Sequence, residues 1–206
     1  MNLAVKLSRY GVLWLSLACF ACVSLERSYP EKRYFVIEAT DVKRSDPAAA
    51  GPILSVVNLQ ISPRYADRSF VYRTSATEYE SDFYNQFLSS PAVMITEETR
   101  KILAASSKFR FVVGTTSSLA ANYLLEGSIN ALYGDFRKPS APAAVLEIEF
   151  FLHDETPGNP GIALQKRYVK SVPLDERSPE ALVRGWSEAL EAVVATLVAD
   201  MAERKL

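Results

Sequence analysis

The sequence predicts a single domain of the α/β class, in its α+β form, that ends in a long amphipathic helix. Several segments alternate apolar and polar residues, which is the pattern of half-buried strands. Two serine-proline pairs, at 90–91 and 178–179, each precede apolar residues at helical spacing, and proline is favoured at the first position of a helix. We find no internal repeat and no second domain boundary, so these elements are expected to share one core.

The first half of the domain is expected to be mainly β-structure. Residues 34–39 (YFVIEA), 54–62 (LSVVNLQIS) and 69–75 (SFVYRTS) each alternate in the manner of a strand. A loop rich in Asp, Pro, Ala and Gly separates the first two strands. The next stretch, 77–87 (TEYESDFYNQF), fits either a continuation of the sheet or an aromatic-rich crossover.

A surface helix is predicted over residues 91–105. Its apolar residues fall on one stripe, Met94, Ile95, Ile102 and Leu103. Residues 109–113 (FRFVV) then predict a short buried strand. From 123 to 133 the alternation is regular, and one face of this strand is expected to carry Leu125, Gly127, Ile129, Ala131 and Tyr133.

An antiparallel hairpin and a terminal helix complete the predicted domain. The turn-forming stretch DETPGNPG separates the alternating runs AAVLEIEFFLHDE and IALQKRYVKSV, and a symmetric register would place Glu149 close to Arg167. The core face of the first run is Ala144, Leu146, Ile148, Phe150 and Leu152. The helix presents its apolar residues at spacings of three and four, namely Leu182, Trp186, Leu190, Val193, Leu197 and Met201.

The N-terminal segment has the layout of an export signal. Lys6 and Arg9 precede an uncharged run over residues 11–25. This run is shorter than the roughly 20 apolar residues that cross a bilayer, although an uncleaved membrane anchor is an alternative. Such a layout indicates that the mature protein is exported.

Both cysteines of the chain lie in the stretch LSLACFAC, inside this segment. Ala21-Cys22 resembles the lipobox of bacterial lipoproteins, with Cys19 as a competing site, and we favour Cys22. The prediction is a lipoprotein signal peptide over 1–21, an acylated N-terminus and tether over 22–33, and a folded domain over 34–206. A thioredoxin-like use of the two cysteines is disfavoured because no soluble strand-to-helix turn surrounds them.

The residues offer no basis for catalysis. His153 is the only histidine, and after cleavage and acylation at Cys22 no free thiol would remain, so a zinc site or a nucleophilic triad lacks partners. No phosphate-binding glycine loop and no hydrolase motif is present. We therefore predict no enzyme, no metal and no cofactor, and a solvated structural role for His153. The 23 basic and 24 acidic residues balance, which argues against nucleic acid as a partner.

One segment, 65–91 (YADRSFVYRTSATEYESDFYNQFLSSP), concentrates aromatic and charged residues. One interpretation is that its aromatic side chains fill the core, and these are Phe70, Tyr72, Phe83 and Phe87. The alternative is a partner-facing rim, since tyrosine and arginine are enriched at interface hot spots. The predicted rim consists of Tyr72, Arg73, Tyr79, Asp82 and Tyr84.

At this cluster the sequence resembles the ABC-type transport auxiliary lipoprotein family, which accompanies MCE-domain intermembrane lipid transporters in Gram-negative bacteria. The resembling segments are the lipobox-like Cys22, EKRYFVIEA, YADRSFVYR, SDFYNQFLSSPAVMITEETRKIL, LYGDFR and AVLEIEFFL. The resemblance implies a mixed or mostly antiparallel sheet flanked by helices. It also implies a protein without a reaction of its own, carrying an N-acyl and S-diacylglycerol lipid on Cys22.

The partners implied by the resemblance are an MCE-domain protein and an ABC permease and ATPase complex that moves phospholipid or another hydrophobic substrate. Val23 after the anchor cysteine, in place of an aspartate, resembles lipoproteins sorted to the outer membrane, where the domain would face the periplasm. Two alternatives stay open: a stand-alone lipid-binding shuttle, which needs an apolar groove between the sheet and the terminal helix, and a structural lipoprotein for envelope assembly.

Overall fold

The computed structural model describes residues 31–40, 51–158 and 160–204. The predicted signal peptide, Cys19, Cys22 and most of the tether lie outside the described residues. The chain divides into two units between Glu31 and Lys32, and the second unit, Lys32–Leu206, holds the fold that follows.

This unit is built from nine strands, two α-helices and a short 3₁₀ helix within the described residues. In chain order the elements are β1 (Arg33–Phe35), β2 (Ile53–Val56), β3 (Gln60–Ile61), η2 (Pro63–Tyr65), β4 (Ser69–Arg73), β5 (Tyr79–Phe87), α2 (Pro91–Ala105), β6 (Phe111–Gly114), β7 (Tyr123–Asp135), β8 (Ala143–Asp154), β9 (Gly161–Pro173) and α3 (Pro179–Glu203).

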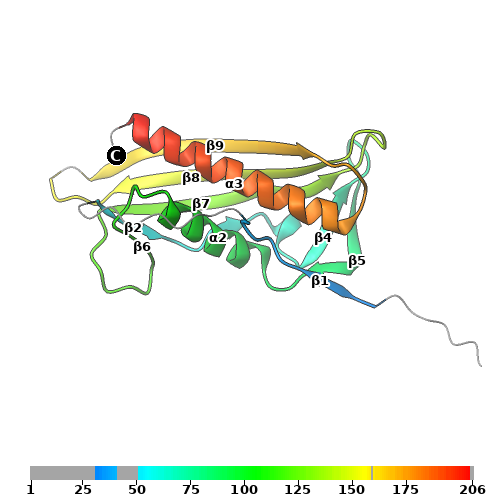
Figure 1. Ribbon diagram of the computed structural model, residues 1–206, viewed down its shortest axis with the longest axis horizontal. Helices are drawn as coiled ribbons and strands as arrows, with labels where there is room; N and C mark the ends of the chain where they lie inside the picture. Colours follow the sequence, from blue (N-terminus) through cyan, green and yellow to red (C-terminus); the bar gives the residue numbers. More distant parts are fainter. Residues whose placement is uncertain (1–30, 41–50, 159, 205–206) are drawn as a thin grey trace, which may run out of the picture. The chain divides into compact units, whose positions relative to one another are not determined.

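The long strand β7 organises a mixed sheet. Along one edge it pairs antiparallel with β8, which pairs antiparallel with β9. Along its other edge β7 pairs in parallel with β2, β3 and β4 in succession. The sheet extends beyond them as β6 beside β2 and as β5 and β1 beside β4. The predicted α+β class with a mixed sheet and a long C-terminal helix is confirmed (Figure 1).

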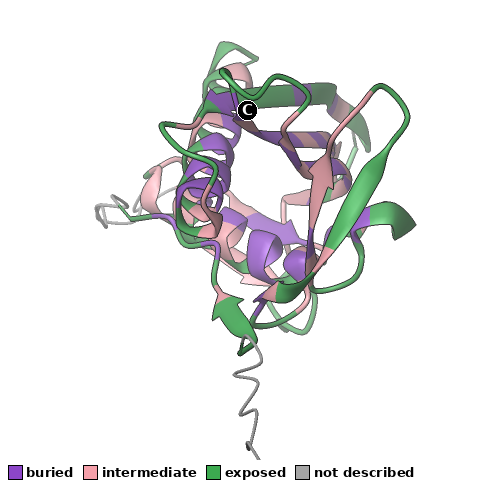
Figure 2. Ribbon diagram, turned by 90° about the vertical axis from the view of Figure 1, so that its right-hand side faces the viewer, coloured by how far each residue is buried: buried purple, intermediate pink, exposed green. Residues whose placement is uncertain are grey.

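Both helices cover one face of this sheet, and α3 lies along β8 and β9 (Figure 1). The six apolar residues predicted to face inward from α3 are all at most 3% exposed. Trp186 packs between Phe70 and Phe87, with ring centroids 5.1 and 5.4 Å away. Buried residues of α3 and of the sheet belong to one hydrophobic core, so side chains fill the space between them. Figure 2 colours much of α3 as buried.

Gly185 allows α3 to approach the sheet closely. A Cβ atom at this position would lie 2.7 Å from the Cβ of Ala144 and 2.8 Å from Cδ2 of Leu174. The helix begins as the sequence predicts, because the Ser178 hydroxyl accepts a hydrogen bond from the backbone N–H of Ala181. Ser90 occupies the N-cap position of α2, but its side chain makes no capping hydrogen bond.

The predicted strand over residues 34–39 is wrong beyond Phe35, where β1 ends. Ile37 and Ala39 are buried, so the alternation is real, but the backbone there bonds to helix side chains. The N–H of Glu38 donates to Ser187 Oγ at 3.2 Å, and the N–H of Ala39 donates to Glu98 Oε2 at 2.9 Å. Packing against α2 and α3 produces the same period of two that a strand would.

The predicted strand over 54–62 is divided into β2 and β3. Between them the backbone N–H of Leu59 donates to Thr96 Oγ1 of α2 at 3.0 Å instead of to a neighbouring strand.

The stretch 77–87 is resolved in favour of the sheet, since its larger part forms β5. The short strand predicted at 109–113 exists as β6, but it is an edge strand and its Phe111 is 43% exposed, so the prediction of burial is wrong.

A bulge in β7 corrects the predicted face of that strand. Ile129 lies opposite Ile148, but the register shifts after it, so Leu132 lies opposite Leu146 in the core. Tyr133 is then opposite Val145 and does not share the face of Leu125 and Ile129.

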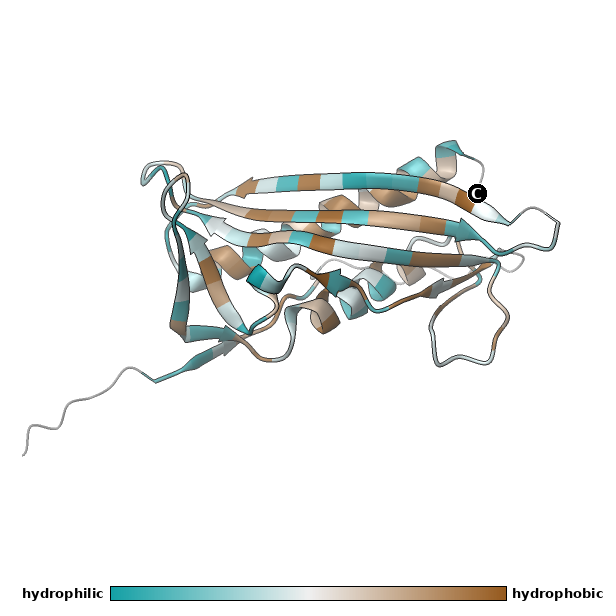
Figure 3. Ribbon diagram, turned by 180° about the vertical axis from the view of Figure 1, so that it is seen from behind, coloured by the Kyte–Doolittle hydropathy of each residue, from teal (hydrophilic) through white to brown (hydrophobic). Residues whose placement is uncertain are grey.

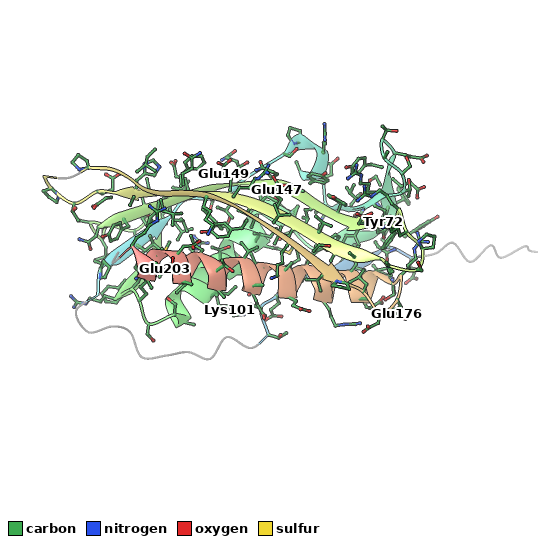
Figure 4. All side chains as sticks on the ribbon, turned by 90° about the horizontal axis from the view of Figure 1, so that it is seen from above. Tyr72, Lys101, Glu147, Glu149, Glu176 and Glu203 are labelled. Atoms are coloured by element: carbon green, nitrogen blue, oxygen red, sulfur yellow. The ribbon has the colours of Figure 1, made fainter. Side chains whose placement is uncertain are left out.

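The hairpin of β8 and β9 is confirmed with its register, including Glu149 opposite Arg167. The closest ionic contact is diagonal, from Arg167 Nη1 to Glu147 Oε1 at 3.4 Å, while Glu149 accepts a hydrogen bond from Gln165. Figure 4 labels Glu147 and Glu149. Figure 3 shows the alternation of hydrophilic and hydrophobic residues along β7, β8 and β9.

Candidate functional site

A depression of about 360 Å³ lies where β4 and β5 meet the start of α3. Its lining combines aromatic, acidic, amide and cationic groups: Tyr72, Thr74, Glu80, Asp82, Asn85, Phe136, Arg177, Ser178 and Pro179. Figure 4 places Tyr72 at the same end of the sheet as Glu176, which comes just before α3. Two of the five predicted rim residues, Tyr72 and Asp82, lie in this depression.

The carboxylate of Asp82 is the organising group of the depression. The Tyr72 hydroxyl donates to Asp82 Oδ2 at 2.7 Å, and Asn85 Nδ2 donates to the same oxygen at 2.7 Å. Oδ1 accepts from the backbone N–H groups of Tyr84 and Asn85 at 2.8 and 2.9 Å. The carboxylate thereby fixes the irregular stretch of β5 that shifts its register against β4.

These contacts set the ionisation of both partners. Burial of Asp82 raises its pKa, but the hydrogen bonds from Asn85, Tyr72 and Tyr84 together outweigh it, so the pKa lies below the usual value. Burial, followed by the hydrogen bond to Asp82, raises the pKa of Tyr72 far above its usual value. At neutral pH the pair is a carboxylate that accepts a hydrogen bond from a neutral phenol.

An aromatic stack leads from this pair to the helix. The Tyr72 ring stacks on Phe136 with centroids 5.1 Å apart, and the Arg177 guanidinium lies 4.5 Å from the Phe136 ring centroid. The sequence did not single out Phe136 or Arg177 as site residues, because both are more than 60 positions from Tyr72 along the chain. Their presence beside Tyr72 depends on the pairing of β4 with β7 and on the position of α3.

Arg73 and Tyr79 lie on the opposite face of the sheet, since neighbouring residues of a strand point to opposite sides. The Arg73 guanidinium is 5.5 Å from the Tyr79 ring centroid and donates to Ala76 O at 2.9 Å, which holds the β4–β5 turn. Tyr79 packs edge to face against Tyr133, with centroids 5.8 Å apart. Burial, with a smaller contribution from Tyr79, raises the pKa of nearby Tyr65 to about 12.

Tyr84 lies neither in the depression nor with Arg73 and Tyr79, because its ring packs edge to face on Phe83 with centroids 5.2 Å apart. The five predicted rim residues thus occupy three places. The alternative that the aromatic residues of this segment fill the core holds for Phe70 and Phe87, which are 0% and 2% exposed. It is wrong for Phe83, which is 64% exposed.

The only histidine of the sequence, His153, does not line the depression. His153 is half-buried and pairs with Glu126 across β7 and β8, with Nε2 and Oε2 3.2 Å apart. Among the described residues there is no group of three or more His, Cys, Asp or Glu side chains arranged to hold a metal ion. No helix within the described ranges is both long and apolar enough to cross a bilayer.

Comparison with known proteins identifies one family. A family model described as "ABC-type transport auxiliary lipoprotein component" matches residues 35–198. No functionally curated protein matches the chain.

Solved structures that share the fold include the following two. A protein from Xanthomonas campestris, assigned to the family model DUF330, has a TM-score of 0.66 at 15% identity, with 85% of this chain and 95% of that chain covered. An uncharacterized protein has a TM-score of 0.61 at 16% identity, with coverage of 83% and 99%. The segment that the family model matches, residues 35–198, runs from the last residue of β1 into the last third of α3. It includes every residue that lines the depression.

Proposed function

We propose that this chain, which belongs to the family of ABC-type transport auxiliary lipoprotein components, is anchored by a lipid on Cys22 and docks its folded domain onto a transport complex. The single observation that carries the proposal is the family match over residues 35–198, which spans nearly the whole folded unit. The family is described as a transport component and not as an enzyme.

The depression beside α3 is the docking site in this proposal. Its groups suit recognition: the Asp82 carboxylate, whose pKa is lowered, the Arg177 cation over Phe136 and the exposed Glu80. A partner that carries complementary charges could pair with these groups and cover the aromatic stack of Tyr72 and Phe136. Charged and aromatic side chains around such a depression give specificity and orientation.

The proposed partners are an MCE-domain protein and the ABC permease and ATPase that work with it, and the proposed cargo is phospholipid or another hydrophobic molecule. Val23 after the acylated cysteine supports placement in the outer membrane, with the domain facing the periplasm. In this arrangement the domain meets a partner that reaches across from the inner membrane.

Carriage of lipid by the domain alone is disfavoured. A shuttle needs an apolar groove between the sheet and α3, and the described side chains fill that space, with Leu190, Val194 and Leu197 each 0% exposed. The depression described above carries charged and amide side chains and is open to solvent, so it does not enclose an acyl chain.

Site-specific photo-crosslinking in a native host tests the proposed docking. A photoreactive residue at the exposed Glu80 should crosslink to an MCE-domain or ABC transport protein, whereas one at Val169, which is 56% exposed on β9, should not. Crosslinks from Val169 alone would move the docking site to the edge strand. Capture of envelope proteins unrelated to transport from Glu80 would contradict the transport role.

A further inference from the structure

A second surface, distinct from the depression, gathers large apolar side chains where the folded unit begins. It lies on β1, on β5 and on residues next to β1, β4 and β5. We define this interfacial patch as Lys32, Tyr34, Arg68, Phe83, Tyr84 and Leu88. Phe83, Leu88 and Tyr34 are 64%, 57% and 50% exposed. Figure 2 views this end of the domain and shows β1 and much of β5 as exposed.

Alternation along β1 places two members of the patch, Lys32 and Tyr34, on one face. Arg33 and Phe35 point to the side that α3 covers, since the half-exposed Arg33 guanidinium bonds to Asn85 and to Glu180 of α3, and the Phe35 ring lies 5.3 Å from Phe70. Lys32 and Tyr34 therefore point outward.

Cationic groups connect the aromatic side chains of the patch. Lys32 Nζ lies 4.3 Å from the Phe83 ring centroid, and the Arg68 guanidinium lies 5.9 Å from that of Tyr34. Arg68 Nη1 also donates to the backbone oxygen of Leu88 at 3.2 Å. Aromatic rings and aliphatic groups are thus interleaved with two cations on one surface.

This composition matches a membrane-water interface. Tyrosine rings gather at the level of lipid headgroups, phenylalanine and leucine insert at the boundary with the acyl chains, and lysine and arginine extend toward phosphate groups. Glu31 and Asp67 flank the two cations in the sequence, so net charge contributes little and the apolar side chains supply most of the attraction.

The position of the patch in the chain points to the same occupant. Lys32 follows Cys22 by ten residues, and a fully extended chain of that length reaches roughly 34 Å. An anchor at Cys22 therefore keeps this surface close to a bilayer, while the tether length allows it to turn toward the lipid. We propose that the interfacial patch docks onto the phospholipid surface that holds the anchor, an inference that rests on acylation of Cys22 as proposed above.

Fluorescence quenching by lipid tests this docking. The full-length protein is expressed with Phe83→Trp, reconstituted into vesicles of phosphatidylethanolamine and phosphatidylglycerol, and compared on vesicles that contain brominated phosphatidylcholine. The matched control is Ile162→Trp, because Ile162 is 60% exposed at the start of β9, which Figure 1 places at the other end of the sheet from β1. Emission of the parent protein is subtracted, and intact mass reports acylation.

Brominated lipid is expected to quench most of the emission at position 83 and to leave that at position 162 unchanged. If the protein is acylated and floats with the vesicles but position 83 is not quenched, the docking is overturned and the anchor stands. If the mass shows no acylation, the anchor on Cys22 is overturned, and quenching at position 83 by added vesicles then supports docking without an anchor. If the mass shows no acylation and position 83 is not quenched either, the anchor and the docking are both overturned. A blue shift at position 83 that grows with protein concentration, without vesicles, would assign the patch to a second copy of the chain and overturn docking.

Discussion

The hydroxyl of Tyr72 donates a 2.7 Å hydrogen bond to the carboxylate of Asp82, ten residues later in the chain, across the irregular part of β5. This bond joins β4 to the stretch of β5 that lines the depression. Its strength therefore controls both the shape of the proposed docking site and part of the stability of this end of the sheet.

Tyr72→Phe should lower the free energy of unfolding by about 1 kcal/mol, because Asp82 keeps its bonds to Asn85 and Tyr84 and the ring still stacks on Phe136. Asp82→Ala should cost more, about 2 kcal/mol, since it also leaves two backbone N–H groups without an acceptor. Urea denaturation measures both values. Equal effects of the two substitutions would contradict the organising role of the carboxylate.

Stability should fall in acid through a second carboxylate, Asp200, which joins α3 to β9. Burial opposes ionisation of Asp200, but hydrogen bonds from Lys166 Nζ at 2.8 Å and from the Tyr168 hydroxyl at 2.6 Å outweigh it, so its pKa is lowered. The unfolded chain then binds the proton more readily than the folded one. The contribution of Asp200 is therefore complete above the unfolded pKa of about 4 and is lost as pH falls through the lower folded pKa.

Thermal unfolding of wild type and Asp200→Asn between about pH 2 and pH 7 checks this dependence. The difference in melting temperature between the two proteins should be largest at neutral pH and should shrink below about pH 4. A difference that is constant across this range would show that Asp200 acts through packing and not through its charge.

Gly185→Ala should destabilise the domain by about 1–3 kcal/mol, although alanine favours helix by about 1 kcal/mol over glycine. The added methyl would meet Ala144 and Leu174 at less than 3 Å and push α3 away from β8. Gly161→Ala is the control, because nothing lies within 4 Å of a Cβ there. Chemical denaturation should show a near-neutral control, and a stabilised Gly185→Ala would refute the close approach.

Cys22→Ala should abolish acylation and release the protein from the membrane fraction, whereas Cys19→Ala should change neither. Intact mass spectrometry and membrane fractionation of the full-length protein measure both outcomes. Acylation that persists in Cys22→Ala and disappears in Cys19→Ala would move the anchor to Cys19. An unprocessed wild type would favour the uncleaved membrane anchor.

The sequence predicted the elements whose signals are local. The β8–β9 hairpin and α3 each carry an unbroken period, and a turn or a serine-proline start marks their limits. The division of β2 from β3 could not be predicted, because the interrupting hydrogen bond joins Leu59 to Thr96 of a helix that comes later in the chain.

The candidate site was predicted in part. The assignment of Tyr72 and Arg73 to one rim overlooked the period of two, which places neighbouring residues of β4 on opposite faces. Phe136 and Arg177 could not be placed beside Tyr72 from spacing alone, because β7 and α3 bring them there.

The edge of β7 that β2, β3 and β4 share also constrains the order in which the domain can fold. Each of these short strands pairs with residues that come more than 60 positions later, from Leu54 with Tyr123 to Tyr72 with Gly134. Closing such long loops is slow, and contacts of this range are a mark of slow folding. The first third of an emerging chain therefore has no β7 to pair with, and a fragment that stops before Tyr123 would leave β2, β3 and one edge of β4 without their β7 partner.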